Sequence, residues 1–197
     1  MRFSIIIPAY NAEGHIRKAL DSVKSQTFKD YECIVVCDSC TDKTLEIAKS
    51  YHFRTAEVDF HNDGLTRSKG LDMARGEYVL FMDDDDWWLH EYVLDQIDRK
   101  LRGEDILCFS FIFKGQGYAS PKSMGGKHWI AVWSKCWKRS FIGKTRFPNV
   151  EAVSDWFFHE ECFKKNPWVV DWDMPMYYYN FLRRGSISDK RQRGEPI

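Results

Sequence analysis

Short apolar runs alternate with amphipathic segments through the first half of the chain. Runs with the length of buried strands occur at Phe3–Ile7, Cys33–Cys37, Arg54–Val58 and Tyr78–Met82, the third being the weakest. The segments between these runs are long enough for helices. Strands that alternate with helices form a mainly parallel sheet, so the pattern predicts an α/β fold.

Helical periodicity supports this interpretation of the intervening segments. Apolar side chains recur on one helical face at Ile16, Ala19, Leu20 and Val23. Further helices are expected from Thr41 or Asp42, either of which can cap the first turn, to Tyr51, from Gly64 to Arg75, and over residues 90–102.

The second half of the chain is less regular. Ile106–Phe113 has the pattern of a strand, and residues 114–127, rich in Gly, Ser and Lys, are expected to form a mobile loop. A helix over Asp155–Lys165 and an extended aromatic segment over Trp168–Phe181 are expected next, before a polar, basic tail. No internal repeat or linker divides the 197 residues, so we expect one domain.

Composition places the chain among globular, intracellular proteins. At 44% hydrophobic and 16% aromatic residues it can bury a core. No apolar run reaches the roughly 18 residues of a transmembrane helix, and the N-terminus enters a strand pattern without the layout of a signal peptide. The six cysteines lie mostly in apolar patterns, which favours reduced thiols and a cytoplasmic location. Cys37 and Cys40 form a C-x-x-C pair with no second pair, so redox or zinc use stays an alternative.

The net charge of zero hides an uneven distribution. Residues 1–105 hold 21 acidic and 14 basic side chains, whereas residues 106–150 hold eight basic and no acidic ones. The basic stretch could contact an anionic partner, including phosphate, a membrane surface touched peripherally, or nucleic acid; a solvated basic face explains it equally well. None of the common nucleic-acid-binding folds is indicated, so a nucleic-acid partner is not favoured.

Four consecutive aspartates, Asp83–Asp86, follow the fourth apolar run. Ligands bind at the carboxyl ends of strands in open α/β sheets, where these carboxylates are expected. In an extended segment Asp83 and Asp85 would project to one side and Asp84 and Asp86 to the other. Adjacent carboxylates repel unless a cation neutralises them, and oxygen ligands favour Mg²⁺ or Mn²⁺. The alternative is an acidic loop in water, but the following Trp87–Trp88 suggests a walled pocket.

A set of further segments accompanies this acidic run. In chain order they are Ser4–Asn11, Val35–Asp42, Thr66–Gly70, Ala74–Tyr78, Phe81–Asp86, Trp133–Arg139, Ser154–Trp156, Tyr178–Tyr179 and Gly185–Ser188. In order and spacing the set resembles family 2 of the inverting glycosyltransferases, which have the nucleotide-sugar fold called GT-A. The resemblance covers nearly the whole chain, and its specificity comes from the ordered set.

The resemblance implies a Rossmann-like, mostly parallel central sheet flanked by helices in one domain. Residues 1–105 would be the donor-binding half with the D-x-D metal segment, and residues 106–197 the acceptor and catalytic half. The implied reaction moves a sugar from a nucleoside diphosphate, UDP being favoured, to a hydroxyl of a glycan or of a lipid-linked or cell-surface precursor. Mn²⁺ or Mg²⁺ is the implied cofactor.

The resemblance also assigns residues to the donor. Asp85 would bind the metal directly, Asp83 would contact the metal or the ribose, and Asp84 would line the same pocket. The other donor-binding candidates are Pro8, Ala9, Tyr10, Asn11, Glu13, Asp38, Asn62 and Arg67, with Asp38 accepting a hydrogen bond from the uracil N–H. Arg183, Arg184, Ser186 and Ser188 are candidates for a clamp over the diphosphate.

The candidate general base is Asp155. Inversion needs one group that takes the proton of the acceptor hydroxyl, and the N-terminus of a helix favours a negative charge there. From the residues alone, a cap of that helix is the favoured interpretation of Asp155, and the resemblance is what favours the base. His159 and Glu160, one turn on, are weaker candidates.

The chain departs from the family pattern at four positions. Cys37 replaces an acid, Cys40 a serine, Ser68 an asparagine and Ser154 a glutamate. The chain retains the other residues of the pattern, which are Asp38, Arg67, the metal acids of the acidic run and Asp155. We therefore expect an active enzyme with an altered donor pocket.

Three other functions would explain parts of the sequence. A nucleotidyltransferase would also use acidic metal ligands, but it would need a Gly-rich loop after the first strand, which Pro8–Gly14 lacks. A non-catalytic nucleotide-sugar binding module would explain the departures from the pattern. A glycosyltransferase acting on a modified nucleic-acid base would use the basic stretch, and its affinity would fall steeply with salt.

Overall fold

The computed structural model describes residues 1–122, 128–150, 153–184, 189 and 192–194. Its strands are β1 (Phe3–Ala9), β2 (Tyr31–Asp38), β3 (Arg54–Val58), β4 (Tyr78–Phe81), β5 (Trp87–Trp88), β6 (Ile106–Phe113), β7 (Gly117–Ala119), β8 (Lys135–Lys138) and β9 (Val169–Tyr179). Its helices are α1 (Ile16–Lys24), α2 (Thr44–Ser50), α3 (Asp63–Met73), α4 (Val93–Lys100), the 3₁₀ turn η1 (Val132–Ser134), α5 (Arg139–Ile142) and α6 (Ser154–Phe163).

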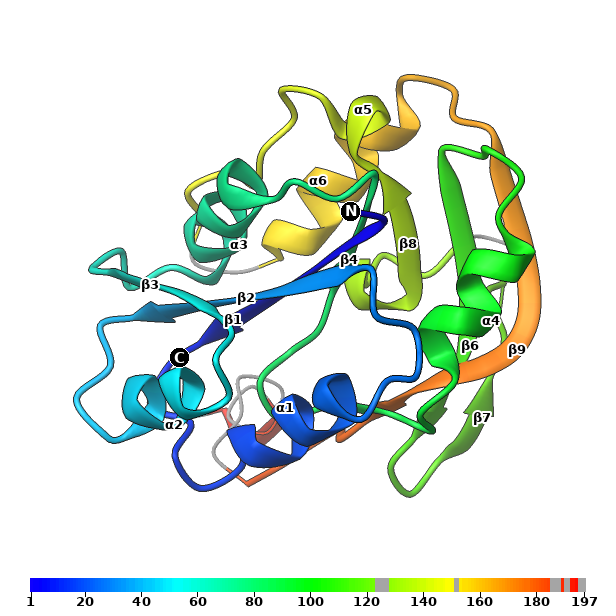
Figure 1. Cartoon of the computed structure of the whole chain (residues 1–197). Helices are drawn as coiled ribbons and strands as arrows, with labels where there is room; N and C mark the ends of the chain where they lie inside the picture. The colour runs from blue at the N-terminus through cyan, green and yellow to red at the C-terminus, as the bar shows by residue number, and fades with distance from the viewer. Residues whose placement is uncertain (123–127, 151–152, 185–188, 190–191, 195–197) are drawn as a thin grey trace.

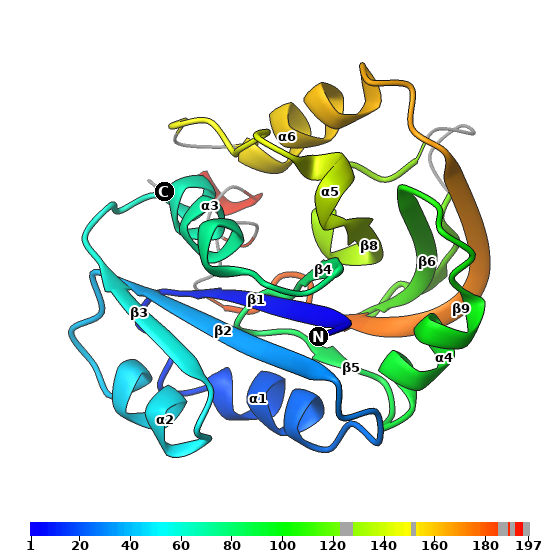
Figure 2. The ribbon, with the colours of Figure 1, turned by 45° about the horizontal axis from the view of Figure 1, so that its top comes forward.

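One sheet runs through the molecule (Figure 1). The strand order is β3-β2-β1-β4-β8-β6-β9-β5, and β7 pairs with β6. Helices α1 and α2 lie on one face of the sheet, and α3, α5 and α6 lie on the other (Figure 2). The predicted α/β fold with a single domain is confirmed.

The sheet is parallel where the sequence pattern is regular and mixed beyond it. Strands β3, β2, β1 and β4 are parallel to one another. Strand β8 then lies between β4 and β6 and is antiparallel to both. Because β8 comes from residues after 105 and pairs with β4, the two expected halves share one continuous sheet.

Two local predictions need correction. The expected loop over residues 114–127 contains β7, which forms a hairpin with β6. The helix expected from Thr41 or Asp42 begins at Thr44, whose amide and hydroxyl both donate to Asp42. Trp87 and Trp88, which are expected to wall a pocket, form the short strand β5 and pair with β9; the pocket wall stays a prediction.

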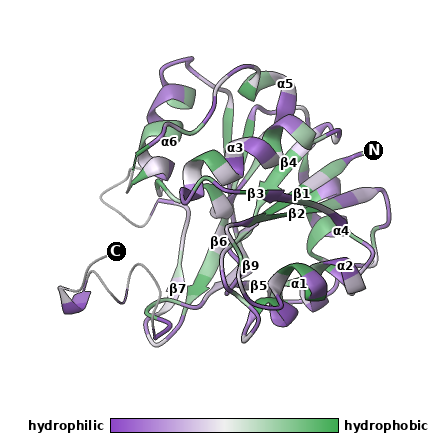
Figure 3. Cartoon of the chain, turned by 90° about the vertical axis from the view of Figure 1, so that its left-hand side faces the viewer, coloured by the Kyte–Doolittle hydropathy of each residue, from purple (hydrophilic) through white to green (hydrophobic). Residues whose placement is uncertain are grey.

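Helix α3 packs closely on β1, with the side chain of Ile6 directly beneath Gly70. A Cβ built on Gly70 would lie 2.3 Å from Cγ2 of Ile6, so only glycine fits at this crossing. The close approach holds α3 over the sheet, in which the apolar side chains of β1, β2 and β4 are buried. Figure 3 shows β6 of the same sheet in the green of hydrophobic residues. It also fixes the position of Arg67, which lies one turn before Gly70 on the same helix.

The basic stretch does not present all its charges to solvent. Lys122 pairs with Asp171 and Arg146 with Asp72, while Lys135, Lys138 and Arg139 donate to backbone carbonyls. Within the described residues, these five bases therefore serve internal contacts. No described helix has the length and hydropathy needed to span a bilayer. All six cysteines are free thiols.

Candidate functional site

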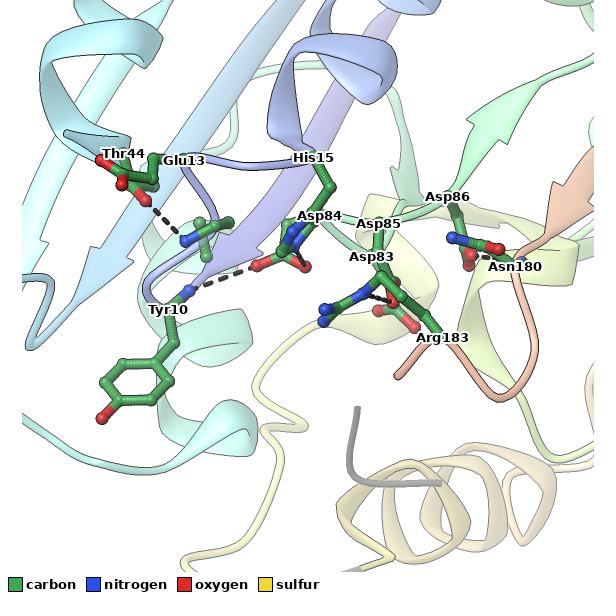
Figure 4. A network of polar contacts seen from close by, with 12 residues as sticks. Tyr10, Glu13, His15, Thr44, Asp83, Asp84, Asp85, Asp86, Asn180 and Arg183 are labelled. Atoms are coloured by element: carbon green, nitrogen blue, oxygen red, sulfur yellow. Dashed lines mark hydrogen bonds and ion pairs between the residues drawn. The ribbon is translucent and has the colours of Figure 1, made fainter. Parts of the chain in front are cut away.

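The acidic segment follows β4 and lies beside the turn that follows β1 (Figure 4). Asp84 accepts hydrogen bonds from the backbone N–H of Tyr10 at 3.3 Å and lies 3.2 Å from Nε2 of His15. Asn11, in the left-handed region at φ 44°, accepts from the Thr41 amide at 2.8 Å. These bonds tie together the turns at the carboxyl ends of β1, β2 and β4, where ligands bind in such sheets.

The four aspartates do not alternate as an extended strand would. Strand β4 ends at Phe81, and the amide of Asp86 donates to the carbonyl of Asp83, which closes a turn. Asp83 and Asp85 lie together in the centre of the site, as predicted (Figure 4). Asp84 and Asp86 point to opposite sides, so the prediction that they share a side is wrong.

Asp86 has a structural role that the sequence did not suggest. Its side chain is fully buried and accepts hydrogen bonds from the Tyr177 hydroxyl at 2.7 Å and the Asn180 amide at 2.8 Å. The same Tyr177 hydroxyl accepts from the amide of Asp83 at 3.1 Å. Asp86 therefore fastens the end of β9 to the acidic turn, and the only sequence signal was its place as the fourth acid of the run.

Arg67 is the centre of the site. Its buried guanidinium contacts Asp63 at 2.5 Å and Asp83 at 2.7 Å, and its Nη1 lies 3.7 Å from Oδ1 of Asp155. Burial opposes the charge, but the three carboxylates outweigh it and raise the pKa of Arg67 well above its usual value. The arginine is not a surface residue; it joins the acidic segment to the candidate base.

Asp155 lies in the first turn of α6 but does not cap it. Residue Val153 is the N-cap, and no side chain caps the helix. Oδ2 of Asp155 accepts from the Val132 amide at 3.3 Å, whereas Oδ1 is buried and has no hydrogen-bond partner in the described structure. Burial raises the pKa of Asp155, although Arg67 opposes the shift. The cap interpretation is therefore wrong, and one carboxylate oxygen, Oδ1, makes no hydrogen bond in the described structure but lies within ion-pair distance of Arg67.

The weaker candidates beside it do not match this geometry. His159 is buried, and neither ring nitrogen has a hydrogen-bond partner. Burial lowers the pKa of His159 to about 3, so the ring stays neutral. Glu160 is 47% exposed.

Asp83 and Asp85 have the properties of metal ligands. Burial, together with the charges of Asp155 and Asp85 and despite Arg67, raises the pKa of Asp83 to about 7; burial and Asp84 raise the pKa of Asp85. One oxygen of Asp83 accepts from Arg67 at 2.7 Å, and one oxygen of Asp85 accepts from Nε of Arg183 at 2.7 Å. The second oxygen of each carboxylate has no hydrogen bond in the described part of the chain. Two crowded carboxylates with free oxygens fit a hard divalent cation.

Asp38 and Asn62 position α3. Asp38 accepts bonds from Ser39, Thr66 and the amides of residues 60–62, and these donors outweigh burial so that its pKa is lowered. Asn62 caps α3 by accepting from the Leu65 amide at 2.9 Å. Asp38 already has five donors, so a uracil N–H would be a sixth. The contact between Asp38 and uracil stays a prediction.

The remaining donor candidates lie around the first turn. Tyr10 is 59% exposed beside Asp84, and Pro8 and Ala9 precede it at the end of β1. Glu13 accepts from the Lys43 amide at 3.0 Å and so joins the turns after β1 and β2. Of the candidate clamp, Arg183 contacts Asp85 and Arg184 is exposed, while Ser186 and Ser188 lie outside the described residues.

The departures from the family pattern leave these contacts intact. Ser68 accepts from the Phe147 amide at 2.9 Å, and Ser154 donates to Asp63 at 3.2 Å. Cys37 is buried in β2, and the Cys40 thiol donates to the Ala9 carbonyl at 3.4 Å. The replacements therefore support neighbouring segments of the site.

The fold and this arrangement of acids define the GT-A class of nucleotide-sugar transferases. The family model described as "Glycosyl transferase family 2" matches residues 4–159, so the chain belongs to that family. It is 27% identical over 220 residues to the glycosyltransferase GlyA of Streptococcus pneumoniae, covering 95% of this chain and 31% of that protein.

Two solved structures share the fold. The Staphylococcus aureus TarS fragment 1-349, in complex with UDP-GlcNAc, has a TM-score of 0.82 at 24% identity, over 96% of this chain and 61% of that one. The mannosyltransferase PcManGT of Pyrobaculum calidifontis, in complex with GDP-Man and Mn²⁺, has a TM-score of 0.75 at 17% identity, over 98% and 60%. This chain thus spans less than two thirds of each of these relatives.

Proposed function

We propose that this chain is a metal-dependent inverting glycosyltransferase that moves a sugar from a nucleoside diphosphate, UDP being favoured, to an acceptor hydroxyl. The observation that carries the proposal is the Arg67 guanidinium, which contacts Asp83 of the acidic segment and lies 3.7 Å from Asp155. In a single displacement, the base and the leaving diphosphate must flank the same sugar carbon. One guanidinium that pairs with Asp83 on the donor side and with Asp155 as the base would hold these two ends of the site at a fixed separation.

The donor end of the site would hold Mn²⁺ or Mg²⁺ through the free oxygens of Asp83 and Asp85. When bound, such a cation acts as a Lewis acid that neutralises the leaving diphosphate. The complex of PcManGT with GDP-Man and Mn²⁺ supports the metal, and the complex of TarS with UDP-GlcNAc supports a nucleotide-sugar donor. Arg183, which contacts Asp85, is placed to add positive charge next to the diphosphate.

The base end of the site is Asp155. Its free Oδ1 would take the proton of the acceptor hydroxyl as the acceptor oxygen forms its bond to the anomeric carbon and the bond to the diphosphate oxygen breaks. A raised pKa brings a carboxylate closer to the working pH and makes it a better proton acceptor. Trp156, 42% exposed and next to Asp155, is the aromatic ring placed to contact an acceptor.

The proposed acceptor is a hydroxyl of a glycan or of a lipid-linked or cell-surface precursor. The proposed compartment is the cytoplasm, since six free thiols fit a reducing environment. The internal contacts of the basic stretch do not favour a nucleic-acid acceptor.

Thermal unfolding with nucleotides tests the donor site. UDP, GDP, dTDP and CMP would each be added with and without Mn²⁺ to the wild type, to Asp85→Ala and to Asp30→Ala, a control on an exposed side chain. A ligand at about 100 times its Kd stabilises a protein by roughly 2.7 kcal/mol. We expect UDP with Mn²⁺ to stabilise the wild type and Asp30→Ala only. Stabilisation of Asp85→Ala to the same extent would refute the metal assignment.

Turnover separates the enzyme from a binding module. Release of UDP from UDP-sugars, with and without glycan acceptors, is the measurement. The wild type should release UDP, while Asp155→Asn should bind UDP with Mn²⁺ normally and lose at least about 10²-fold in kcat, as for a general base. Donor binding without turnover by the wild type would favour the non-catalytic alternative.

A further inference from the structure

Lys135, the first residue of β8, carries a buried ammonium group. The residue is 1% exposed, and its Nζ donates to the carbonyl oxygens of Trp129 and of Ala131, the latter at 2.8 Å, with Ser134 Oγ at 3.5 Å. No described carboxylate lies within ion-pair distance of Nζ. Burial lowers the pKa of Lys135 to about 8, and the charges that act on it are Cys108, Asp155 and Asp171. Burial of a charge without an ionic partner is costly, which makes its acceptors informative.

One of those acceptors belongs to the peptide group that holds the base. The carbonyl of Ala131 and the N–H of Val132 are the two ends of one peptide unit. The carbonyl accepts from Lys135, and the N–H donates to Oδ2 of Asp155 at 3.3 Å. A charged donor on the carbonyl polarises the amide and strengthens its N–H as a donor, because hydrogen bonds in a chain reinforce one another.

The rest of the segment is fixed as well. The carbonyl of Val132 accepts from the indole N–H of Trp137 at 3.0 Å, and the Ser134 hydroxyl donates to the Ala131 carbonyl at 3.1 Å. Trp137 and Val132 are both fully buried. The peptide that faces Asp155 and the peptide after it are therefore both held by side-chain donors.

The two oxygens of Asp155 are thus distinguished. Oδ2 is held by the Val132 amide, and Oδ1 is left without a hydrogen bond on the side of Arg67. We propose that Lys135 is a positioning residue for the general base, fixing Oδ2 of Asp155 through the Ala131–Val132 peptide so that Oδ1 receives the proton. The inference rests on the proposed function, since it takes Asp155 as the base.

The test uses two ways of breaking the relay, each with a control. Lys135→Met removes the charge at similar side-chain length, and Lys138→Met on the same strand removes an ammonium that also donates to a backbone carbonyl, that of Gly103. Val132→Pro removes the N–H and also changes the buried side chain, at the first position of η1 where proline is favoured, while Val132→Ala changes the side chain and keeps the N–H. Each variant is first shown to be folded by its stabilisation with UDP and Mn²⁺.

The measurements are kcat, the KM for the donor and the pH dependence of kcat with saturating UDP-sugar. We expect Lys135→Met and Val132→Pro each to lower kcat at least about tenfold relative to their controls. A misplaced catalytic group can cost roughly 10²-fold, so a loss of this size is in range. The KM for the donor should not change. The acid limb of kcat should move to higher pH in both, because the carboxylate loses a favourable donor or cation while Arg67 and Asp63 still act on it. Lys135→Arg, which keeps the charge, should retain the wild-type limb.

Two results would overturn the proposal. The first is a kcat and acid limb in Lys135→Met equal to those of Lys138→Met. The second is a loss in Lys135→Met that Val132→Pro does not share, since the relay would then not pass through that peptide. Undiminished turnover by Asp155→Asn is a separate result, which refutes the base assignment itself.

Discussion

A buried neutral histidine should make the stability of this protein depend on pH. His159 on α6 is 5% exposed, its ring stacks on Phe163 with centroids 4.0 Å apart, and neither nitrogen makes a hydrogen bond. Burial first, and then the charges of Lys135 and His128, lower the pKa of His159 from 6.5 to about 3. In the unfolded chain the ring takes up a proton near pH 6.5, whereas in the folded protein it does not until far lower pH. Stability is therefore highest above pH 6.5 and is lost as the pH falls below it.

The size of the effect follows from the two pKa values. Between pH 7.5 and pH 5 the linkage relation gives a loss of about 2 kcal/mol from this group alone. For a chain of this length that corresponds to a fall of roughly 4–8 °C in Tm. His159→Phe keeps a ring against Phe163 but does not titrate. Its Tm should therefore fall by roughly 4–8 °C less than the Tm of the wild type between pH 7.5 and pH 5.

The assay is calorimetry or circular dichroism on the wild type and on His159→Phe at both pH values. The difference between the two proteins cancels the other titrating groups. His61→Asn, at an exposed site with a positive φ that asparagine tolerates, is the control and should behave as the wild type does. If the wild type and His159→Phe lose the same Tm, His159 is protonated in the folded protein and the reasoning fails.

Further predictions concern packing and the acidic turn. Gly70→Ala should lower the free energy of unfolding by about 1–3 kcal/mol because its Cβ would overlap the β1 side chain beneath it, whereas Gly14→Ala, with open space around it, should not; equal urea midpoints would contradict this. Tyr177→Phe removes one of the two donors to the buried carboxylate of Asp86, so we expect a loss of about 1–3 kcal/mol in urea unfolding together with weaker UDP–Mn²⁺ binding; unchanged binding would show that the turn holds itself. Arg183→Gln should weaken UDP more than UMP in titration calorimetry, because the guanidinium on Asp85 is placed for the outer phosphate; an equal loss for both would argue against the clamp.

The sequence could predict the features of the fold that depend on residues close together in the chain. The periodicity of the first half placed β1 to β4 and α1 to α4, because each element there is one uninterrupted apolar pattern. The acidic run could be placed at the carboxyl edge because it directly follows β4. The position of β8 could not be predicted, since a four-residue strand has no periodicity to read and its place depends on pairing with β4 and β6.

The contacts that make the site are long-range, and this is why the sequence did not show them. Arg67 and Asp155 come from α3 and α6, and no local pattern states that these helices converge on β4. Arg183 reaches Asp85 only because Asp86 fastens the end of β9 to the acidic turn. The relay from Lys135 uses a backbone amide, a donor that every residue except proline carries, so nothing in the side-chain pattern could indicate it.

The replacement of glutamate by Ser154 is explained by the charge balance around Arg67. One guanidinium there already faces three carboxylates, those of Asp63, Asp83 and Asp155. The Ser154 hydroxyl donates to Asp63, and a Cβ on Gly64 would come within 2.9 Å of the Ser154 Cβ, so α3 and α6 meet at this point with no room to spare. A glutamate side chain there would add a fourth negative charge beside Asp63 in a buried, crowded contact, which would raise the pKa values of all the acids around it. Serine instead supplies a donor where one is needed, so the departure stabilises the same charge cluster that the retained residues form.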